Sequence, residues 1–450
     1  MPSSRREFLH QSASLAAGTL LPAQAVPAEV AGASLQPKTT SAADTLSVAL
    51  IGCNNMGWAN LSSMLKHPGV RCVGLCDVDQ TVLAKRAADL EKLAPSSPTN
   101  PKPALYSDFR KVLENKMIDA VIVGTPDHWH CLPTVMACQA GKDVYVEKPM
   151  ANSIEECNLM VAAARKYGRI VQVGQWQRSG NHWREAIEFV QSGKLGNIRL
   201  VKTWAYMTYG RKFDPKPDAP VPAGVDYDMW LGPAPKRPFN EARFHGSFRY
   251  FWDYAGGLMT DWGAHMIDMG LWGIKQSAPK SVVAMGGRFG YPNHAGDTPD
   301  TMQVLYDFGN VTLQWEQGLG LGQAPFGRDA GVAFIGNNGT LVADRDGWNL
   351  FPEADDDQFM TPGLPRQPRY GNDLDRHTLN FLECVRSRKQ PNASAEVGRN
   401  VALHAQLGNI SYRLGQKLIW NEATQSVVDN PKANELVRAH YRSPWTLPTV

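Results

Sequence analysis

The chain has few cysteines, and none of them forms a C-x-x-C pair. Seven cysteines occur among 450 residues, six of them before residue 158. Cys72 and Cys76 lie four residues apart in an apolar stretch, and a regular strand would place both side chains on one face as small core residues. The pattern predicts buried, reduced thiols rather than a disulfide framework, as expected of a chain that folds in a reducing compartment.

The chain also lacks a strong net charge. The formal net charge is +3, from 46 basic and 43 acidic residues that do not gather into blocks of one sign. This balance gives no sign of nucleic-acid binding or of attachment to an anionic membrane surface. We therefore expect a small-molecule substrate and no nucleic-acid partner. The length is enough for two domains with cores of their own.

The N-terminal residues resemble an export signal. The pair Arg5-Arg6 precedes the apolar run Ala13–Leu21, which is too short to span a bilayer, and a small-x-small site follows at Ala23–Ala25. An accidental Arg-Arg pair is the alternative. The pattern predicts a twin-arginine signal peptide over residues 1–25 and a flexible linker over residues 26–45. It also predicts a periplasmic or otherwise exported protein without a membrane span, which folds before it leaves the cytosol.

After residue 45 the sequence alternates strand-like and helix-like segments. The strand-like segments are short, apolar and followed by turns; they are Leu46–Ile51, Val70–Cys76, Ala104–Tyr106, Ala120–Gly124 and Val144–Glu147. The helix-like segments run to about Lys66 and then over Gln80–Leu93, Phe109–Glu114 and Pro133–Ala140. Repeated strand–helix–strand units predict an α/β fold, with a doubly wound parallel sheet of the Rossmann type over residues 46–168 and a second domain over residues 169–450.

The turn after the first predicted strand is a modified dinucleotide-binding fingerprint. The usual Gly-x-Gly-x-x-Gly becomes Gly52-x-Asn54-x-x-Gly57, with asparagine in place of the middle glycine. Asparagine tolerates a positive φ best after glycine, and its amide can donate a hydrogen bond to phosphate. Asp77 stands where a carboxylate accepts from a ribose 2′-hydroxyl and repels a 2′-phosphate. The pattern favours NAD over NADP, although Asp77 is also an ordinary residue for the end of a strand.

A second turn with binding character follows the fourth predicted strand. It contains Thr125, Pro126, His128, Trp129 and His130, at the carboxyl end of the strand, where open α/β sheets bind their ligands. His-x-His can belong to a metal site, but the sequence offers no third ligand at a typical spacing. We therefore expect no metal. We expect Thr125-Pro126 to pack against the cofactor, with His130 or Trp129 directed at its nicotinamide end.

The most informative stretches are Glu147-Lys148-Pro149 and the segment from Gly256 to Asp268. Lys148 follows a buried strand, and the proline after it ends the ladder because it has no N–H to donate. Asp261 and His265 are four residues apart and share one helix face. A lysine, a carboxylate and a histidine can together move a proton while a hydride leaves a C–H bond. The alternative is a surface lysine and an ordinary capped helix.

The segment from Trp176 to Trp272 is rich in aromatic residues that alternate with basic ones. Aromatic rings stack on the C–H faces of sugars, and basic side chains donate to sugar hydroxyls. The set favours a carbohydrate substrate. The candidate contacts are Trp129, Trp176 and Tyr206. For any one of these aromatic residues taken alone, a position in the core is the favoured interpretation. Residues 213–238 are rich in proline and glycine and predict an irregular loop over the pocket.

Together these motifs resemble the Gfo/Idh/MocA family, whose members include glucose–fructose oxidoreductase and inositol dehydrogenase. The matching stretches are the glycine turn, Asp77, Thr125-Pro126-Asp127-x-x-His130, Glu147-Lys148-Pro149, Val173-Gly174-Gln175-Trp176-Gln177-Arg178, Gly256-Gly257…Asp261-x-x-x-His265 and Asn380–Val385. The resemblance implies an N-terminal Rossmann domain and a C-terminal α/β domain with a largely antiparallel open sheet. It also implies a homodimer or homotetramer.

The resemblance also implies a role for each motif. Lys148 would bind the reacting hydroxyl, His265 would take its proton, and Asp261 would orient substrate and histidine. These three are the predicted catalytic residues and also predicted substrate contacts. The residues expected to contact NAD are Gly52, Asn54, Asn55, Met56, Gly57, Asp77, Thr125, Pro126, His130, Glu147, Lys148, Gln175 and Arg178.

The sequence therefore predicts an exported NAD-dependent dehydrogenase acting on a CH–OH group of a sugar, glycoside or cyclitol. NAD is not freely supplied outside the cytoplasm, so we expect it to stay bound and to be recycled. The main alternative is an NAD-dependent glycoside hydrolase, which oxidises, eliminates, hydrates and re-reduces its substrate. Lys148 favours the dehydrogenase, because the hydrolases that this chain resembles lack the lysine. A carbohydrate-binding module with an idle Lys148 is a third reading.

Overall fold

The computed structural model describes residues 45–97, 100–210, 213–355, 358–359 and 361–450. The twin-arginine pair, the predicted signal peptide and nearly all of the predicted linker lie outside these residues. Within the described part, no helix is both long enough and apolar enough to cross a membrane.

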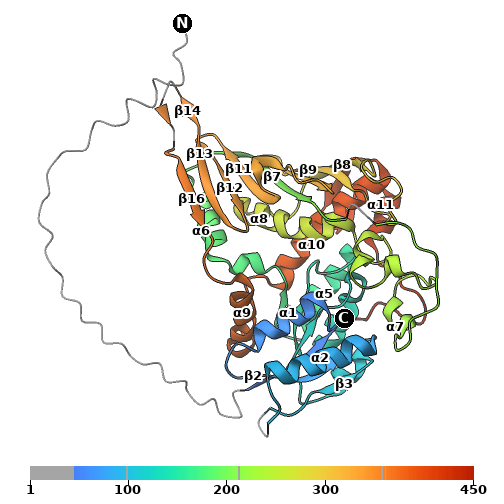
Figure 1. Cartoon of the computed structure of the whole chain (residues 1–450). Helices are drawn as coiled ribbons and strands as arrows, with labels where there is room; N and C mark the ends of the chain where they lie inside the picture. Colours follow the sequence, from blue (N-terminus) through green and yellow to red (C-terminus); the bar gives the residue numbers. More distant parts are fainter. Residues whose placement is uncertain (1–44, 98–99, 211–212, 356–357, 360) are drawn as a thin grey trace, which may run out of the picture. The chain divides into compact units, whose positions relative to one another are not determined.

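A parallel sheet of six strands forms the core of the N-terminal half (Figure 1). Its spatial order is β3-β2-β1-β4-β5-β6, with β1 (Leu46–Ile51), β2 (Val70–Cys76), β3 (Ala104–Tyr106), β4 (Ala120–Val123), β5 (Asp143–Val146) and β6 (Val171–Val173). The helices between them are α1 (Asn55–Met64), α2 (Gln80–Leu93), α3 (Phe109–Glu114), α4 (Cys131–Gln139) and α5 (Ile154–Lys166). The predicted Rossmann-type sheet is confirmed, and β6 belongs to it although it lies beyond the predicted boundary at residue 168.

Local sequence explains where these elements begin. Asp79, Asp108 and Ser153 each accept a hydrogen bond from a backbone N–H in the first turn of the following helix, which satisfies a donor that the helix itself cannot pair. All four residues of β4 and of β5 are buried, as expected of central parallel strands covered on both faces. The strands therefore end at fixed points, and their carboxyl ends meet along one edge.

A ten-stranded, largely antiparallel sheet forms the C-terminal half, as predicted. Only β7 and β10 pair in parallel. Its order is β16-β13-β12-β11-β7-β10-β9-β8-β17-β18, with β7 (Ile198–Met207), β8 (Ser281–Gly287), β9 (Thr301–Asp307), β10 (Thr312–Leu319), β11 (Ala330–Gly336), β12 (Gly339–Asp344), β13 (Gly347–Pro352), β16 (Leu364–Pro368), β17 (Leu418–Asn421) and β18 (Ser426–Val427). A separate short hairpin pairs β14 (Ala354–Asp355) with β15 (Gln358–Phe359).

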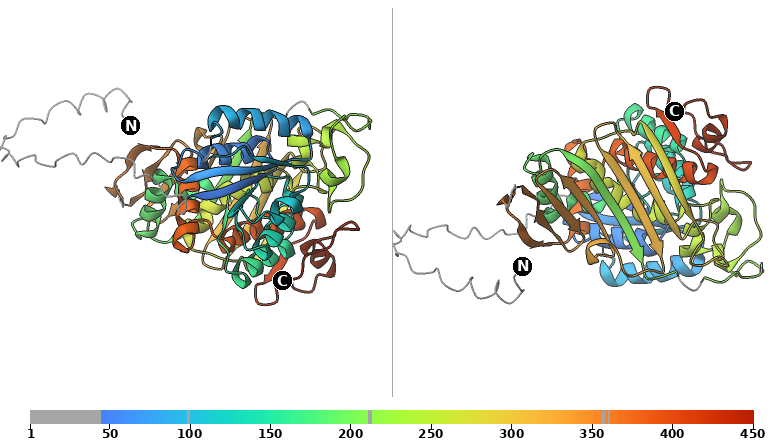
Figure 2. Two further views of the ribbon diagram at one scale, coloured as in Figure 1. Left: turned by 90° about the horizontal axis from the view of Figure 1, so that it is seen from below. Right: turned by 90° about the horizontal axis from the view of Figure 1, so that it is seen from above.

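Helices cover one face of this large sheet and leave the other face open (Figure 2). The covering helices are α6 (Asn181–Gln191), α8 (Ala264–Ile274) and α10 (Ala395–Leu414). Side chains from α8 and from the sheet share one apolar cluster, which includes Ile267, Val201 and Trp315. Alternate residues of β7 therefore point toward the helices, while the residues between them face outward.

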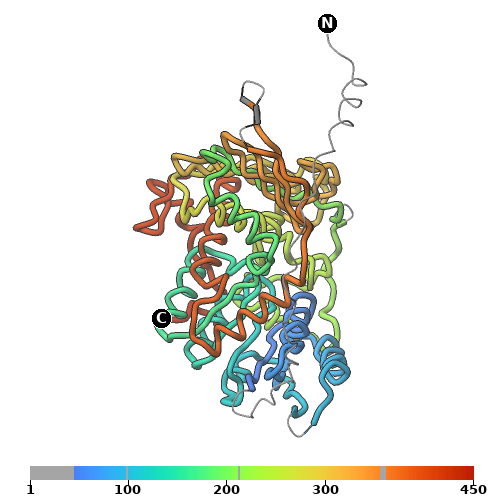
Figure 3. The backbone as a smooth tube through the Cα atoms, turned by 90° about the vertical axis from the view of Figure 1, so that its left-hand side faces the viewer, coloured from blue at the N-terminus to red at the C-terminus, as the bar shows by residue number. Residues whose placement is uncertain are grey.

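The C-terminal helices return to the N-terminal half (Figure 3). Helix α9 (Asp373–Ser387) packs against α1, and its Phe381 lies in one apolar cluster with Val48 and Leu50 of β1. Ser63 of α1 donates to Asp375 of α9 at 2.6 Å. The two halves are therefore joined by a shared core, so that residues from both can be held at fixed positions relative to each other.

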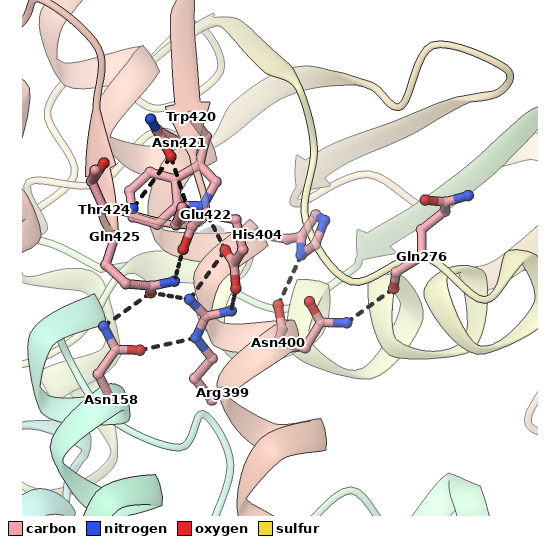
Figure 4. A network of polar contacts seen from close by, with 11 residues as sticks. Asn158, Gln276, Arg399, Asn400, His404, Trp420, Asn421, Glu422, Thr424 and Gln425 are labelled. Atoms are coloured by element: carbon pink, nitrogen blue, oxygen red, sulfur yellow. Dashed lines mark hydrogen bonds and ion pairs between the residues drawn. The ribbon is translucent and has the colours of Figure 1, made fainter.

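A polar network on α10 reinforces this junction (Figure 4). The Arg399 guanidinium donates to Asn158 of α5 at 2.9 Å and to Glu422 beyond β17 at 2.8 Å, and also contacts Gln425. Glu422 in turn accepts from the Trp420 indole at 2.7 Å. One arginine thus connects a helix of the Rossmann domain with the edge of the large sheet. Its bonds are charge-assisted, which makes them stronger than neutral ones.

All seven cysteines have free, buried thiols, but the predicted arrangement of Cys72 and Cys76 is wrong. Cys72 lies in the apolar cluster with Leu50 and Leu75, whereas Cys76 lies in the cluster with Ile51. The pairing of β1 with β2 shifts by one residue between Val48 and Ala49. A β-bulge adds one residue to a strand and so reverses the faces on either side of it.

Residues 213–255, called the strap below, fold over the edge where the strands of the parallel sheet end. They contain only short helices, α7 (Tyr227–Leu231), η4 (Glu241–Arg243) and η5 (His245–Tyr250), and have an aromatic cluster of their own. Their backbone bonds to the start of α2 and the end of β2, through Gln80 N to Gly224 O and Asp226 N to Val78 O, each at 2.9 Å. The predicted irregular loop is therefore part of a packed segment.

Candidate active site

A groove runs between the carboxyl ends of the parallel strands and the strap. The space between its walls is about 1070 Å³, a volume that includes the part open to solvent. One wall consists of Gly52, Asn54, Asn55, Met56, Asp77, Thr125, Pro126, His130, Glu147 and Lys148, and the other of Trp230, His245, Phe248 and Arg249. Ten predicted cofactor contacts thus line a single groove, at the edge where open α/β sheets bind their ligands.

The glycine turn leaves no room for side chains, as a pyrophosphate cradle requires. A Cβ at Gly57 would lie 2.1 Å from the Gly52 carbonyl oxygen, and a Cβ at Gly52 would lie 2.7 Å from the Gly124 backbone. The turn lies at the N-terminus of α1, where backbone N–H groups favour anions. The positive φ predicted for Asn54 is found at Asn55 instead, because Asn54 is extended and caps α1.

Asp77 is held where a ribose hydroxyl could donate to it. Its Oδ2 accepts from Cys53 N at 2.7 Å and its Oδ1 from Asp79 N at 3.0 Å. Burial raises the pKa of Asp77, while these two backbone bonds act in the opposite direction. Asp79 caps α2 and contacts the strap through His245 Nε2 at 3.0 Å. The residues of this corner fit an adenine nucleotide with a free 2′-hydroxyl.

Lys148 connects the two halves of the molecule at one end of the groove. It follows β5, and its Nζ donates to Asp261 Oδ1 at 2.6 Å and to the Asp261 carbonyl oxygen at 3.0 Å. Arg249 of the strap lies 3.4 Å from the same Asp261 oxygen. Burial would raise the pKa of Asp261, but the charges of Lys148 and Arg249 outweigh it and hold the pKa at about 2. Asp261 is therefore ionised at neutral pH.

Asp261 and His265 belong to one continuous helical segment. Asp261 lies in a π-helical turn, η6 (Met259–Gly263), which leads directly into α8 and His265. Such turns are rare and frequently mark functional sites. The His265 ring lies between Trp176 and Trp262, at centroid distances of 5.9 and 6.0 Å. The helical segment thus brings Asp261 into contact with Lys148 and His265 into its electrostatic range.

The surroundings of His265 disfavour the protonated form of its imidazole. Burial, together with the positive charges of Lys148 and Arg345, lowers its pKa well below the usual value. Its imidazole is therefore neutral at neutral pH. Its Nδ1 is buried without a hydrogen-bond partner in the described part of the chain.

Two further carboxyl groups lie near Lys148 and were not predicted to act in catalysis. Glu147 is buried and accepts from Asn60 Nδ2 at 2.8 Å, and burial raises its pKa. Burial also raises the pKa of Asp127 to about 7, against the opposing charges of Arg249 and Lys148. Glu147 therefore positions the loop that carries Lys148, whereas Asp127 can change its protonation near neutral pH.

Three further predicted contacts, Tyr206, Arg178 and Gln175, do not line the groove, and a fourth, Trp129, lines it but bonds to the strap. Tyr206 faces outward, because it alternates along β7 with Ala205 and Met207, which face the helices. Arg178 pairs with Asp268 at 2.6 Å, and the Gln175 side chain is buried without lining the groove. The Trp129 indole donates to the backbone oxygens of Met229 and Trp230 and so supports the strap.

His130 lines the groove but is not directed at a ligand. Its Nδ1 lies 2.7 Å from the Pro149 carbonyl oxygen and its Nε2 2.8 Å from the Thr125 carbonyl oxygen. Burial lowers its pKa to about 4. The ring therefore fixes the loops on either side of it. Among residues 45–450, as far as they are described, no three His, Cys, Asp or Glu side chains gather as metal ligands do.

Sequence reasoning missed Arg345, which lies in the turn between β12 and β13. Its guanidinium carbon is 4.6 Å from the ring centroid of Trp176 and 4.2 Å from that of Trp262, the two rings beside His265. Arg345 and His265 are 80 positions apart in the sequence. Only the packing of the β12–β13 turn against η3 (Trp176–Ser179) and η6 brings them together, so no local pattern could reveal the contact.

Comparisons with known proteins identify the family of this chain. Residues 46–175 match the profile of the oxidoreductase family with an NAD-binding Rossmann fold, and residues 190–286 and 356–447 match that of its C-terminal alpha/beta domain. The uncharacterized oxidoreductase YrbE of Bacillus subtilis is 24% identical over 81% of this chain and 94% of its own length. A glycosyl hydrolase family 109 protein of Shewanella baltica is 26% identical over 43% of this chain and 44% of its own length.

Solved structures share the fold. A levoglucosan dehydrogenase in complex with NADH and levoglucosan superposes with a TM-score of 0.61, at 17% identity, over 86% of this chain and all of that one. The two profile matches together span most of the chain and both halves of the fold. With the glycine cradle, Asp77 and Lys148 on the groove wall, the chain is an oxidoreductase with an NAD-binding Rossmann domain, and it belongs to the Gfo/Idh/MocA family.

Proposed function

We propose that this protein oxidises a hydroxyl-bearing carbon of a carbohydrate, with NAD held in the groove. The observation that carries the proposal is the 2.6 Å bond from Lys148 Nζ to Asp261 Oδ1. It connects the end of the groove to the helix that carries His265, which lies within electrostatic reach of the same lysine. The proposal places the substrate hydroxyl near this donor, this carboxylate and the imidazole of His265.

The residues divide the work as follows. Bound NAD supplies the acceptor for the hydride. Positive character would build on the carbinol carbon unless the O–H proton also leaves, so a base near the oxygen lowers the barrier, typically by about 10²–10⁴-fold. His265, as a neutral imidazole, takes that proton. Lys148 would donate to the same oxygen and stabilise negative charge as it develops, and Asp261, which accepts from Lys148, orients the lysine.

We infer that NAD stays bound between turnovers. The strap bonds to the end of β2 and the start of α2, and His245 reaches Asp79 beside the predicted ribose position. Its aromatic cluster, with Tyr227, Trp230 and Tyr254, makes it a packed segment rather than an open loop. A cofactor under such a cover leaves slowly, which supports recycling by reduction of a second substrate.

An NAD-dependent glycoside hydrolase remains the second candidate. It is favoured by the partial match to a glycosyl hydrolase family 109 protein. Such an enzyme oxidises a ring hydroxyl, eliminates the glycosidic substituent, adds water and reduces the product, so that the cofactor ends in its starting state. The bond between Lys148 and Asp261 supports the dehydrogenase instead.

The products formed from a panel of glycosides test the proposal. We expect the holoprotein to form a ketone together with reduced cofactor, in equal amounts. Mass spectrometry of the sugar and the absorbance of the nicotinamide measure the two. Free sugar without net cofactor reduction would contradict the dehydrogenase and establish the hydrolase. If the holoprotein turned over no glycoside, sugar or cyclitol, both the dehydrogenase and the hydrolase would be contradicted.

We also propose that the protein is exported in its folded state through the twin-arginine route to the periplasm or beyond. Replacing Arg5 and Arg6 by lysines should leave the precursor in the cytoplasm, with its fold and bound NAD intact, since neither residue belongs to the described fold. Cell fractionation with nucleotide analysis measures this. Arg184→Lys, at an exposed position of α6, is the control that should export normally. Normal export of the double variant would remove the twin-arginine assignment.

The open face of the large sheet supports a homodimer or homotetramer. It exposes large apolar side chains that include Met285 of β8 (76% exposed), Leu305 of β9 (48%), Phe351 of β13 (45%) and Ile419 of β17 (47%). We propose that two copies bury this face against each other, since exposed apolar patches often mark interfaces. Light scattering measures the mass in solution, and a monomer would contradict the proposal.

A further inference from the structure

Arg345 is held rigidly beside the candidate active site. Trp176 and Trp262 flank its guanidinium at 4.6 and 4.2 Å, within the distance at which aromatic rings attract a cation. Its Nε donates to Gln177 Oε1 at 3.2 Å, and the Trp262 indole is fixed in turn by Tyr209 at 2.6 Å. The guanidinium therefore cannot swing away without losing both ring contacts.

The two terminal amino groups of the Arg345 guanidinium make no hydrogen bond within the described part of the chain. No carboxylate lies within 4.0 Å of the guanidinium, among the residues that the structure describes. The neighbouring Asp344 pairs instead with Arg328 at 3.3 Å and with Arg366 at 2.7 Å. Arginines close by in the fold are thus paired, whereas Arg345 is not.

Leaving this cation without a partner is costly. Burial lowers the pKa of Arg345 to about 10, although the charge of Asp261 acts against it, so the group is still charged at neutral pH. Lys148 and Arg249 compete for the same Asp261 carboxylate at 2.6 and 3.4 Å. Asp261 is therefore shared by two nearer cations, and a partly buried cation with no carboxylate within ion-pair distance among the described residues favours an incoming anion.

We propose that Arg345 recognises an anionic group on the sugar, with its two terminal amino groups donating to a pair of oxygens. The inference rests on the proposed function and names its substrate class as acidic sugars. A carboxylate, as in a uronic acid, fits the planar fork of a guanidinium, and sulfate and phosphate esters offer the same oxygen pair. Because Arg345 and His265 contact the same two rings, the charged group would bind close to the reacting carbon.

The test compares matched substrates on the holoprotein. Methyl glucuronide is measured against methyl glucoside, with the 6-sulfate and 6-phosphate of the glucoside as further arms that identify the source of the charge. We expect at least one anionic substrate to exceed the glucoside in kcat/KM by on the order of 10²-fold, because charge-assisted bidentate bonds contribute that much. In Arg345→Met, which keeps the stem between the two rings, the ratio should fall to about one.

Two further variants separate recognition from support. Arg345→Lys keeps the charge without the fork and should give an intermediate ratio. Arg366→Met, which removes a paired arginine near the same turn, should leave the ratio as in wild type. A wild-type ratio near one, or an equal loss on neutral and anionic substrates in Arg345→Met, would overturn the proposal and leave Arg345 as a spacer between two tryptophans.

Calorimetry distinguishes failure of this inference from failure of the proposed function. Binding of glucuronate and of glucose to the holoprotein is measured without turnover. Tighter binding of glucuronate that is lost in Arg345→Met would support the anion site even if no substrate were oxidised. Equal binding of the two sugars would overturn the anion site even if glycosides were oxidised.

Discussion

Replacing Lys148 or His265 by alanine is expected to lower kcat by about 10²-fold or more while NAD stays bound, because both act at the reacting carbon. Lys148 is the only residue of the parallel-sheet half, among those described, that donates to Asp261. His265 is the neutral base beside it. The double variant should lose less than the sum of the single losses in free energy, since both serve one proton transfer. Steady-state kinetics with nucleotide analysis measures both effects.

A matched control lies at the other end of the same strand. Lys142 is buried just before β5, but its Nζ donates to the backbone oxygens of Asn115 and Ile118. Lys142→Met should lower thermal stability and keep turnover.

Asp261→Asn should be milder than the alanine variants if the carboxylate only orients the lysine, and as severe if it shares the charge on His265. Full turnover by His265→Ala would contradict its role as base.

Gly57→Ala is expected to abolish cofactor binding. The new Cβ would lie 2.1 Å from the Gly52 carbonyl oxygen, a backbone contact that cannot yield without moving the turn. Wild-type protein denatured after purification should release NAD(H), and this variant should release at least about tenfold less. A tenfold loss of affinity corresponds to about 1.4 kcal/mol of binding free energy, less than we expect the displaced turn to cost. Gly290→Ala is the control, because the nearest atom would be 3.7 Å away at an ordinary backbone conformation.

The same measurement tests the choice of nucleotide. Asp77 is fixed by two backbone N–H groups at the ribose end of the groove, where its carboxylate would repel a 2′-phosphate. The released nucleotide should therefore be NAD(H). Finding mostly NADP(H) would mean that Asp77 does not face the ribose, and the assignment of that corner would be wrong.

Much of the parallel sheet could be predicted because its signals are local. A buried β-branched run, a capping aspartate and a glycine turn each occupy a few adjacent residues, and the bounds of α2 and α3 agree with the prediction. The bulge that separates Cys72 from Cys76 could not be predicted, since it depends on how β1 and β2 pair. The strap was likewise visible only as a loop rich in proline and glycine, without its packing on α2.

In the candidate site, too, residues in local motifs could be predicted, and residues placed by tertiary packing could not. Lys148, Asp261 and His265 stood out because each belongs to a motif within one element. The structure bonds Lys148 to Asp261 and holds His265 within electrostatic range of the lysine. Arg178 and Tyr206 did not join them, because a buried aspartate and the alternation along β7 decide where they point. Arg345 had no motif at all. Its position depends on a turn of the large sheet that packs against η3 and η6.

Reduction of bound NAD by a sugar in a single turnover tests the central claim most directly. Holoprotein with oxidised cofactor is mixed with substrate, and the nicotinamide absorbance is followed with time. We predict rapid reduction by wild type and a rate lower by about 10²-fold or more in Lys148→Ala, with equal NAD content in both. A Lys148→Ala protein that reduces its cofactor at nearly the wild-type rate would contradict the account and remove the lysine from the mechanism.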